Sequence, residues 1–213
     1  MTINEYLLKL KNTFTPNSVL DIGANIGEFS IFCNKIWPSS NILMIEGNDN
    51  CEDDLIKSNL PYKIKLLGDD NRKVNFYINS NNSKCSGCSY YKEVTNHYDN
   101  SLVVEKELVK LDDITSEKFD IIKIDTQGSE LDIMKGGTNT INSAKYVILE
   151  IATKQYNYGS PLFDEVVSYM VSIGFENMDI IENHIWLDKK LDKFNYGDIF
   201  QIDAVFTKND KTT

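Results

Sequence analysis

Apolar and polar positions along this chain fall into two recurring patterns. Short apolar runs rich in β-branched residues predict strands buried on both faces, and segments with apolar residues at helical spacing separate them. The runs that predict buried strands are SVLDIGA (18–24), NILMIEG (41–47), YKIKLLG (62–68), FDIIKID (119–125) and YVILEIA (146–152). One further run, KVNFYI (73–78), alternates between apolar and polar residues and predicts an edge or hairpin strand.

Helical patterns follow most of these strands. They cover 27–37, about 49–59, a segment beginning near Ser129, and 162–175, which Gly174 ends. This alternation predicts an α/β fold: a doubly wound, Rossmann-like, mostly parallel seven-stranded sheet with helices on both faces. The tail, 176–213, has apolar stretches without long helices between them and predicts an antiparallel β-rich addition.

Length and composition favour one soluble domain, 1–213, with a short helix within 1–17. No apolar run reaches the roughly 18–20 residues that cross a bilayer, and the first residues lack the features of a secretory signal. The four cysteines predict reduced thiols in a cytoplasmic protein. Cys85 and Cys88 have the spacing of half a zinc site or a redox pair, but no second C-x-x-C accompanies them, so we expect neither.

The balance of charge argues against nucleic acid as a partner. The net charge is −10, and Arg72 is the only arginine. A surface that binds nucleic acid usually carries a basic stripe, and base recognition favours arginine. Only a local patch of lysines would allow such a role.

Candidate binding residues gather where the predicted strands end. In sheets of this kind, ligands bind outside the carboxyl ends of the strands. The first strand ends in DIGANIGEFS, with Asp21, Gly23, Asn25 and Gly27. Glycines let the backbone approach a ligand, and the spacing differs from the G-x-G-x-x-G of dinucleotide sites. The acid ahead of the turn suits a ligand that carries a cation, such as the ammonium of an amino acid.

Two more strand ends extend this site. Glu46 follows the glycine turn by about twenty residues, where a carboxylate can accept both hydroxyls of a ribose. Asp69 or Asp70, in LLGDD, can accept from an adenine amino group, although an ordinary surface turn explains the same residues. A ligand with adenine, ribose and an amino-acid tail is S-adenosylmethionine.

Four strings together resemble the FkbM family of class I S-adenosylmethionine-dependent methyltransferases. They are DIGANIGEFS, IEGN, LVKLDDI (108–114) and KIDTQGSELDIMKGG (123–137), and the resemblance covers about 18–152. It implies methyl transfer to a hydroxyl, often on a sugar or polysaccharide precursor, with S-adenosylhomocysteine as the product. The resemblance implies that the cofactor contacts are Asp21, Gly23, Gly27 and Glu46. It also implies that the site signature consists of Asp125, Gln127, Gly128 and Glu130. Gln127 stands where the family more often has Glu.

A hydroxyl acceptor must lose its proton during the transfer, so we expect a general base. Asp125 is the first candidate, and Glu150 ends the neighbouring predicted strand, about 4.8 Å away. Two acids this close raise the pKa of one of them, or they bind a divalent metal, which we consider without expecting it. His97 is a third candidate base, for which a solvated loop histidine is the simpler interpretation.

The irregular tract 79–101 is typical of a lid or a binding loop. Its Tyr90, Tyr91 and Tyr98 offer flat faces and hydroxyls of the sort that hold a sugar, although tyrosine clusters also serve plain packing. Tyr156 should border the same pocket. Glu130 is placed near the acceptor, but a helix N-terminus also favours an acid there. The acceptor, a glycan or a small-molecule hydroxyl, and the oligomeric state stay open.

Three other functions fit parts of the pattern. The protein could bind S-adenosylmethionine without catalysis, as a partner of another protein. It could methylate a small non-sugar alcohol with the help of a divalent metal. A nicotinamide-dependent oxidoreductase is the third, and the missing third glycine argues against it.

Overall fold

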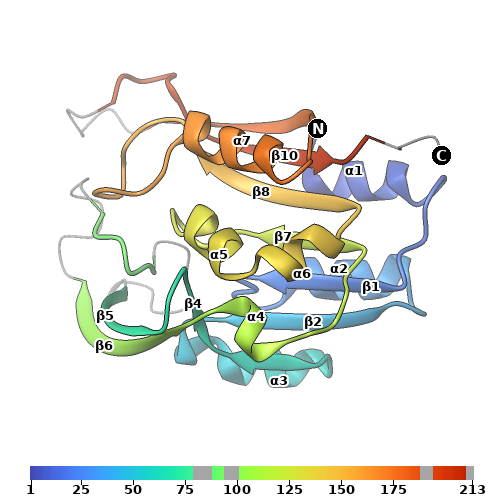
Figure 1. Ribbon diagram of the computed structural model, residues 1–213, viewed down its shortest axis with the longest axis horizontal. Helices are drawn as coiled ribbons and strands as arrows, with labels where there is room; N and C mark the ends of the chain where they lie inside the picture. The colour runs from blue at the N-terminus through green and yellow to red at the C-terminus, as the bar shows by residue number, and fades with distance from the viewer. Residues whose placement is uncertain (79–87, 94–100, 188–193, 210–213) are drawn as a thin grey trace.

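The structure, a computed structural model, describes residues 1–78, 88–93, 101–187 and 194–209. Its centre is a seven-stranded sheet with the order β3-β2-β1-β7-β8-β10-β9 (Figure 1). The strands are β1 (Ser18–Ile22), β2 (Asn41–Glu46), β3 (Tyr62–Ile64), β7 (Ile121–Ile124), β8 (Tyr146–Ala152), β9 (Asn177–Ile185) and β10 (Ile199–Thr207). Strands β3, β2, β1, β7 and β8 pair in parallel, and β10 runs antiparallel to both of its neighbours. The mostly parallel α/β sheet with an antiparallel C-terminal addition is confirmed.

Helices cover the sheet and explain why its central strands are apolar throughout. They are α1 (Ile3–Leu10), α2 (Glu28–Ile36), α3 (Glu52–Ser58), α4 (Leu111–Ile114), α5 (Glu130–Gly136), α6 (Thr138–Ser143) and α7 (Phe163–Ser172), with a 3₁₀ turn, η1 (Asp49–Cys51). All four residues of β7 are buried, as expected of a strand that is covered on both faces. No helix in the described part of the chain is long and apolar enough to span a bilayer.

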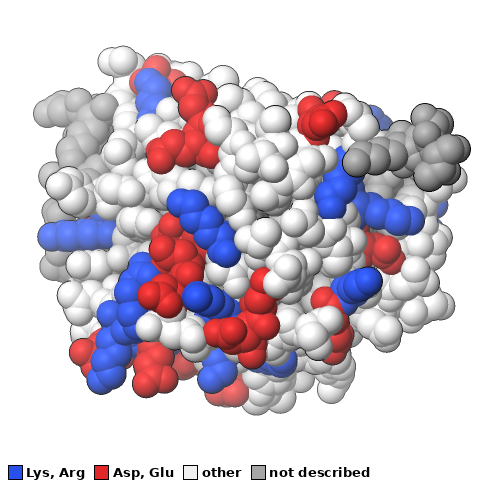
Figure 2. Space-filling model, viewed as in Figure 1, with Lys and Arg blue, Asp and Glu red and all other residues white. Residues whose placement is uncertain are grey.

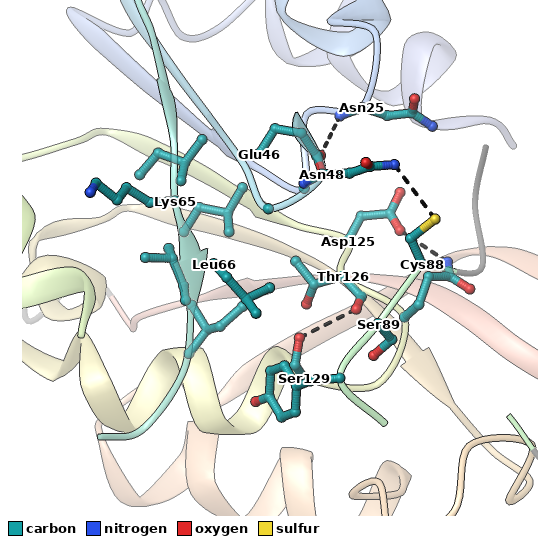
Figure 3. Close-up of a pocket in the computed structure, with 18 of the residues that line it drawn as sticks. Asn25, Glu46, Asn48, Lys65, Leu66, Cys88, Ser89, Asp125, Thr126 and Ser129 are labelled. Atoms are coloured by element: carbon teal, nitrogen blue, oxygen red, sulfur yellow. Dashed lines mark hydrogen bonds between the residues drawn. The ribbon is translucent and has the colours of Figure 1, made fainter. Parts of the chain in front are cut away.

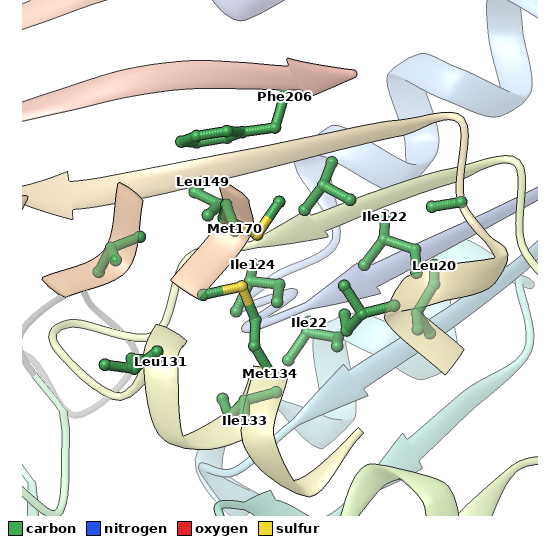
Figure 4. Packing of buried hydrophobic residues seen from close by; sticks show 14 of the residues in the cluster. Leu20, Ile22, Ile122, Ile124, Leu131, Ile133, Met134, Leu149, Met170 and Phe206 are labelled. Carbon is green, nitrogen blue, oxygen red and sulfur yellow. The ribbon is translucent and has the colours of Figure 1, made fainter. Parts of the chain in front are cut away.

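Successive residues of the central strands enter two different cores. Leu20, Ile122 and Leu149 pack with Leu131 and Met134 of α5, as Figure 4 shows. Their neighbours along the strands pack instead with α1 and α2, and these are Val19, Ile121 and Ile148. Each such side chain contributes roughly 1.5–3 kcal/mol when fully buried, so the two cores fix the strands against one another.

The run 62–68 was expected to be one strand, and the structure corrects this. Lys65 separates β3, in the large sheet, from β4 (Leu66–Leu67). Strand β4 pairs with β6 (Leu102–Val109), which pairs in turn with β5 (Arg72–Ile78), and the three form a second sheet. The prediction of an edge or hairpin strand over 73–78 is confirmed, because β5 is at the edge of this sheet and antiparallel to β6. Strand β6 was not predicted from the apolar pattern, because only one of its residues, Leu108, is buried.

Candidate functional site

The turn between β1 and α2 brings the ends of two strands into contact. Gly23 has φ of +74°, and a Cβ at this position would lie 1.8 Å from the carbonyl oxygen of Asp125. Gly27, with φ of +85°, precedes the first turn of α2. Only glycine allows both the positive φ and the close approach at residue 23, so this turn depends on its residue type.

A cavity opens above the carboxyl ends of β1, β2, β7 and β8 (Figure 3). One part of its wall is apolar and is formed by Ile45, Leu66, Leu67 and Phe76. Another part is polar and is formed by Asn25, Glu46, Asp125, Gln127 and Glu150. A cavity with an apolar wall and a few convergent polar groups is the usual form of a small-molecule site.

Glu46 anchors the end of this cavity nearest β2. One oxygen, Oε2, accepts the backbone N–H of Asn25 at 2.8 Å, and Oε1 accepts that of Asn48 at 2.7 Å. Burial raises the pKa of Glu46, although these backbone donors oppose the shift. Each carboxylate oxygen retains a second lone pair, so Glu46 is positioned to accept from a ligand hydroxyl as well.

Asp125 forms the floor of the cavity, next to a buried lysine. The ammonium of Lys123 donates to Asp125 Oδ2 at 2.9 Å, and 9% of the Lys123 side chain is exposed. Burial by itself would raise the pKa of Asp125, but Lys123 holds it below the usual range. Asp125 is therefore ionised at neutral pH, with a fixed positive charge behind it.

Glu150 lies beside Asp125, and its pKa is shifted in the opposite direction. Gln127 Nε2 donates to Glu150 Oε2 at 2.7 Å, and Gln201 Nε2 donates to the same oxygen at 2.8 Å. Gln127 also reaches Asp125 Oδ1 at 3.4 Å. Burial, and then the charge of Asp125, raise the pKa of Glu150 well above its usual value. One acid of the pair is ionised and the other favours its protonated form.

Three residues predicted as cofactor contacts do not line this cavity, and they are Asp21, Gly27 and Asp69. Asp21 is fully buried beneath the glycine turn and accepts from Ser30 Oγ at 2.7 Å, while its Oδ1 has no partner among the described residues. Burial raises the pKa of Asp21. Asp69 forms an ion pair with Arg72 at 2.5 Å in an exposed turn. Asn25 lines the cavity close to Asp21, and Leu66 and Leu67 form the wall near Asp69.

Glu130 braces the signature turn, and it was predicted to contact the acceptor. Its Oε1 accepts from the backbone of Thr126 at 2.9 Å and of Gly128 at 3.2 Å. The neighbouring Gln127 has φ of +57°, which few residues other than glycine adopt. Glu130 is 5% exposed, and burial raises its pKa to about 7. The carboxylate holds the loop that presents Gln127 to the cavity.

Glu130→Gln should change how stability depends on pH. In the folded state Glu130 keeps its proton up to a pH of about 7, whereas in the unfolded chain it releases the proton near its ordinary pKa of 4.5. Between these two pH values the unfolded chain therefore binds fewer protons than the folded protein. The free energy of unfolding of the native protein should therefore fall, relative to the variant, as pH rises through this window, by on the order of 3 kcal/mol. Urea unfolding at several pH values measures it. Parallel pH profiles for the two proteins would contradict the assignment.

The tyrosines divide between the cavity and its support. Tyr90 lines the cavity, and its hydroxyl and that of Tyr91 donate to Asp132 Oδ2 at 2.8 and 2.6 Å. Burial and Asp132 raise the pKa of both. Tyr156, which is 7% exposed, accepts from Gln201, the amide that also donates to Glu150. His97 and Tyr98 lie outside the described residues.

A second cavity meets the first at its floor. Both are lined by Gly23, Asn25 and Asp125, and the second extends between α1 and α2, where Asn4 and Phe29 line it. Lys123 lines only this second cavity. Asp125 therefore stands at a junction between two cavities, of which the first has the apolar wall.

Several site residues were not predicted. Lys123, Asn48, Ser89 and Gln201 all contact or line the site. Lys123 had a visible signal, since it is the one basic residue within an apolar run that otherwise predicts a buried strand. Charged groups elsewhere are mixed: Figure 2 shows Lys and Arg side chains lying among Asp and Glu side chains on the viewed face.

Three solved structures are similar in fold at low sequence identity. Methyltransferase FkbM from Methylobacillus flagellatus KT is 18% identical with a TM-score of 0.55, over 89% of this chain and 43% of its own. Precorrin-6y C5,15-methyltransferase from Geobacter metallireducens GS-15 is 14% identical with a TM-score of 0.52, over 97% and 87%. The N-terminal domain of EvdMO1 with SAH bound is 9% identical with a TM-score of 0.53, over 96% and 79%. This chain thus spans under half the length of the first of them.

A search of curated proteins found no match. The family model for the methyltransferase FkbM domain, in contrast, matches residues 21–177. That range includes the glycine turn, Glu46, the signature around Asp125, and Glu150. The chain belongs to the FkbM methyltransferase family.

Proposed function

We propose that this protein transfers a methyl group from S-adenosylmethionine to a hydroxyl of a sugar or polysaccharide precursor. The observation that carries the proposal is the convergence of Glu46 and Asp125 on one cavity that also has an apolar wall. We also interpret the sheet as doubly wound, because ligands of such sheets bind beyond the carboxyl ends of the strands, where this cavity lies.

The residues present fit the parts of this cofactor. Glu46 has lone pairs for the ribose hydroxyls, and the wall of Leu66, Leu67 and Phe76 suits a flat adenine ring. The turn at Gly23 and Asn25 leaves backbone groups close to the amino-acid tail. S-adenosylmethionine supplies a methyl group on a positively charged sulfur. An ionised Asp125 at the floor favours that charge.

The chain's own residues then align the reactants and take up a proton. Asp125 stands at the junction of the two cavities, so an acceptor in the second cavity meets the methyl group there. The hydroxyl proton passes to the carboxylate pair of Asp125 and Glu150. Ser89 and Tyr90 also line the first cavity, which limits access of water.

A sugar acceptor is supported by the polar lining of the second cavity. Asn4, Asn25 and Lys123 offer donors and acceptors of hydrogen bonds, and Phe29 offers a flat face. Radiolabelled methyl transfer into cell extract, fractionated by size, tests the acceptor class. Label that glycosidases release supports a glycan, whereas label in small glycosidase-resistant molecules would exclude it.

Glu46→Gln should weaken binding of S-adenosylhomocysteine by about 100-fold or more. The two hydrogen bonds from the ribose hydroxyls to the Glu46 carboxylate are worth roughly 1.5–3 kcal/mol each. The glutamine amide would also point its NH₂ group at one of the two backbone N–H groups that donate to Glu46 in the native protein. Calorimetric titration measures the change in Kd. The matched control is Glu117→Gln, which removes the same charge at an exposed position. Equal affinity of both variants would refute the ribose assignment.

A further inference from the structure

Three side chains at the carboxyl rim form a cluster, of which the proposed function uses only Glu150. Glu150, His184 and Asp203 each offer a ligand atom, and these atoms lie within 4.8 Å of one another. They come from the adjacent strands β8, β9 and β10. Asp203 is opposite Glu150 in the register, and His184 is opposite Gln201, two residues from Asp203. Residues two apart share a face, so all three belong to the same face of the sheet.

The spacing of these atoms suits a metal ion. His184 Nε2 lies 3.1 Å from Asp203 Oδ2. Two ligands about 2.1 Å from an ion, at a right angle to each other, lie about 3.0 Å apart. A Glu150 oxygen, within 4.8 Å of both, makes this a set of one nitrogen and two oxygen donors. Asp203 is 8% exposed in its side chain and His184 is 33% exposed, so solvent reaches the cluster through the histidine.

The surrounding charge favours a cation at this place. Among the described residues of this stretch of the face, the carboxylates of Asp125, Glu150 and Asp203 share one ammonium, that of Lys123. Lys123 donates to Asp125 at 2.9 Å, on the far side of Glu150 from Asp203. Of the two acids in the cluster, Asp203 has His184 as its ion-pair partner, and a further acid, Glu182, lies opposite Asp203 in the register. The sequence suggested a metal on Asp125 and Glu150, and Lys123 makes that pair the poorer choice.

Supporting residues already hold one ligand in place. The amides of Gln127 and Gln201 both donate to Glu150 Oε2, at 2.7 and 2.8 Å. Hydrogen bonds of this kind orient metal ligands in known sites and set their affinity. A mixed imidazole and carboxylate set suits Mn²⁺ or Zn²⁺ better than Ca²⁺, which prefers six or more oxygens.

We propose that Glu150, His184 and Asp203 bind one divalent transition-metal ion, such as Mn²⁺, beside the methyl-transfer cavity. The acceptor hydroxyl becomes a further ligand of the ion, which makes its proton easier to remove by Asp125. The role toward the acceptor rests on the proposed function, whereas the metal site itself does not.

Titration with Mn²⁺ tests the site directly. The full chain, freed of metal by a chelator and dialysis, is titrated without cofactor, and bound Mn²⁺ is counted by electron paramagnetic resonance. We expect one ion per chain, with at least tenfold weaker binding in His184→Gln and in Asp203→Asn. Asp179→Asn removes an exposed acid from β9 outside the cluster and should bind like the native protein. No saturable binding up to millimolar Mn²⁺, or unchanged binding in both cluster variants, would overturn the proposal.

A second measurement does not depend on how well the Asp203 variant folds. The chain has two histidines, so the ¹⁵N imidazole signals of His184 are assigned by their loss in His184→Gln. Zn²⁺ at one equivalent should shift these signals, and unshifted signals would overturn the proposal. Calorimetry with S-adenosylhomocysteine in the absence of metal separates the two ideas. If the protein binds S-adenosylhomocysteine but not Mn²⁺, only the metal site is refuted. If it binds Mn²⁺ but not S-adenosylhomocysteine, only the proposed cofactor is refuted.

Discussion

Replacing Gly23 with alanine is expected to lower the free energy of unfolding by more than about 4 kcal/mol, or to prevent folding. The new Cβ would lie 1.8 Å from the carbonyl oxygen of Asp125, and the φ of +74° adds strain for any L side chain. Neither strand end can move away cheaply. The N–H of Gly23 is bound to Ile45 at 2.9 Å, and that of Asp125 to Ile22 at 3.0 Å.

Gly159→Ala is the matched control for this variant. Gly159 has φ of +76°, almost the same as Gly23, but no atom lies within 4 Å of the Cβ that alanine would add. Its replacement should cost only the backbone strain, about 1–2 kcal/mol. Urea unfolding of both variants therefore isolates the close approach of the two strand ends. Equal losses in the two variants would show that β1 and β7 do not meet as described, and the shared cavity would lose its basis.

Much of the site followed from one regularity of the sequence. The apolar runs 18–24, 41–47, 119–125 and 146–152 each have an acid among their last four residues, and the carboxyl ends of parallel strands share one edge of a sheet. Glu46, Asp125 and Glu150 end β2, β7 and β8 or lie beside their ends, and all three line one cavity. The apolar runs were enough to place them together, because the runs 41–47, 119–125 and 146–152 end within one residue of the ends of β2, β7 and β8.

The electrostatic partners could not be predicted in the same way. Lys123 matters because β7 lies next to β1, which places it opposite Asp21 in the register. Apolar runs carry no information on strand order, so the pairing of Lys123 with Asp21 could not be predicted from the sequence. The same holds for Gln201 and Asp203. Strand β10 runs antiparallel, and its first residues therefore reach the rim that the parallel strands reach with their last. A pattern of apolar positions is identical in either direction.

Asp125→Asn is expected to slow methyl transfer by roughly 100- to 10,000-fold, the range for removal of a positioned acid or base. The carboxylate is ionised because of Lys123, stands at the junction of the two cavities, and is coupled to Glu150 through Gln127. Its loss removes both the negative charge that favours the sulfonium and a proton acceptor. The Kd for S-adenosylhomocysteine should change far less than in Glu46→Gln, since Glu46 still holds the nucleoside. Initial rates of label transfer and calorimetry measure the two quantities.

This variant also leaves Lys123 without its hydrogen-bonded carboxylate, so lost activity could reflect lost stability alone. The double variant Lys123→Met and Asp125→Asn separates these causes. Methionine replaces the ammonium, which lies 5.5 Å from the centroid of the Phe29 ring, with an apolar group, and the ion pair disappears as a whole. Removing both partners of such a pair costs less than the two single losses added together, by about 1–3 kcal/mol here because Asp125 is 34% exposed. If the double variant regains stability and stays inactive, Asp125 acts in the reaction. If methyl transfer returns with stability, Asp125 serves only to neutralise Lys123, and its catalytic role is refuted.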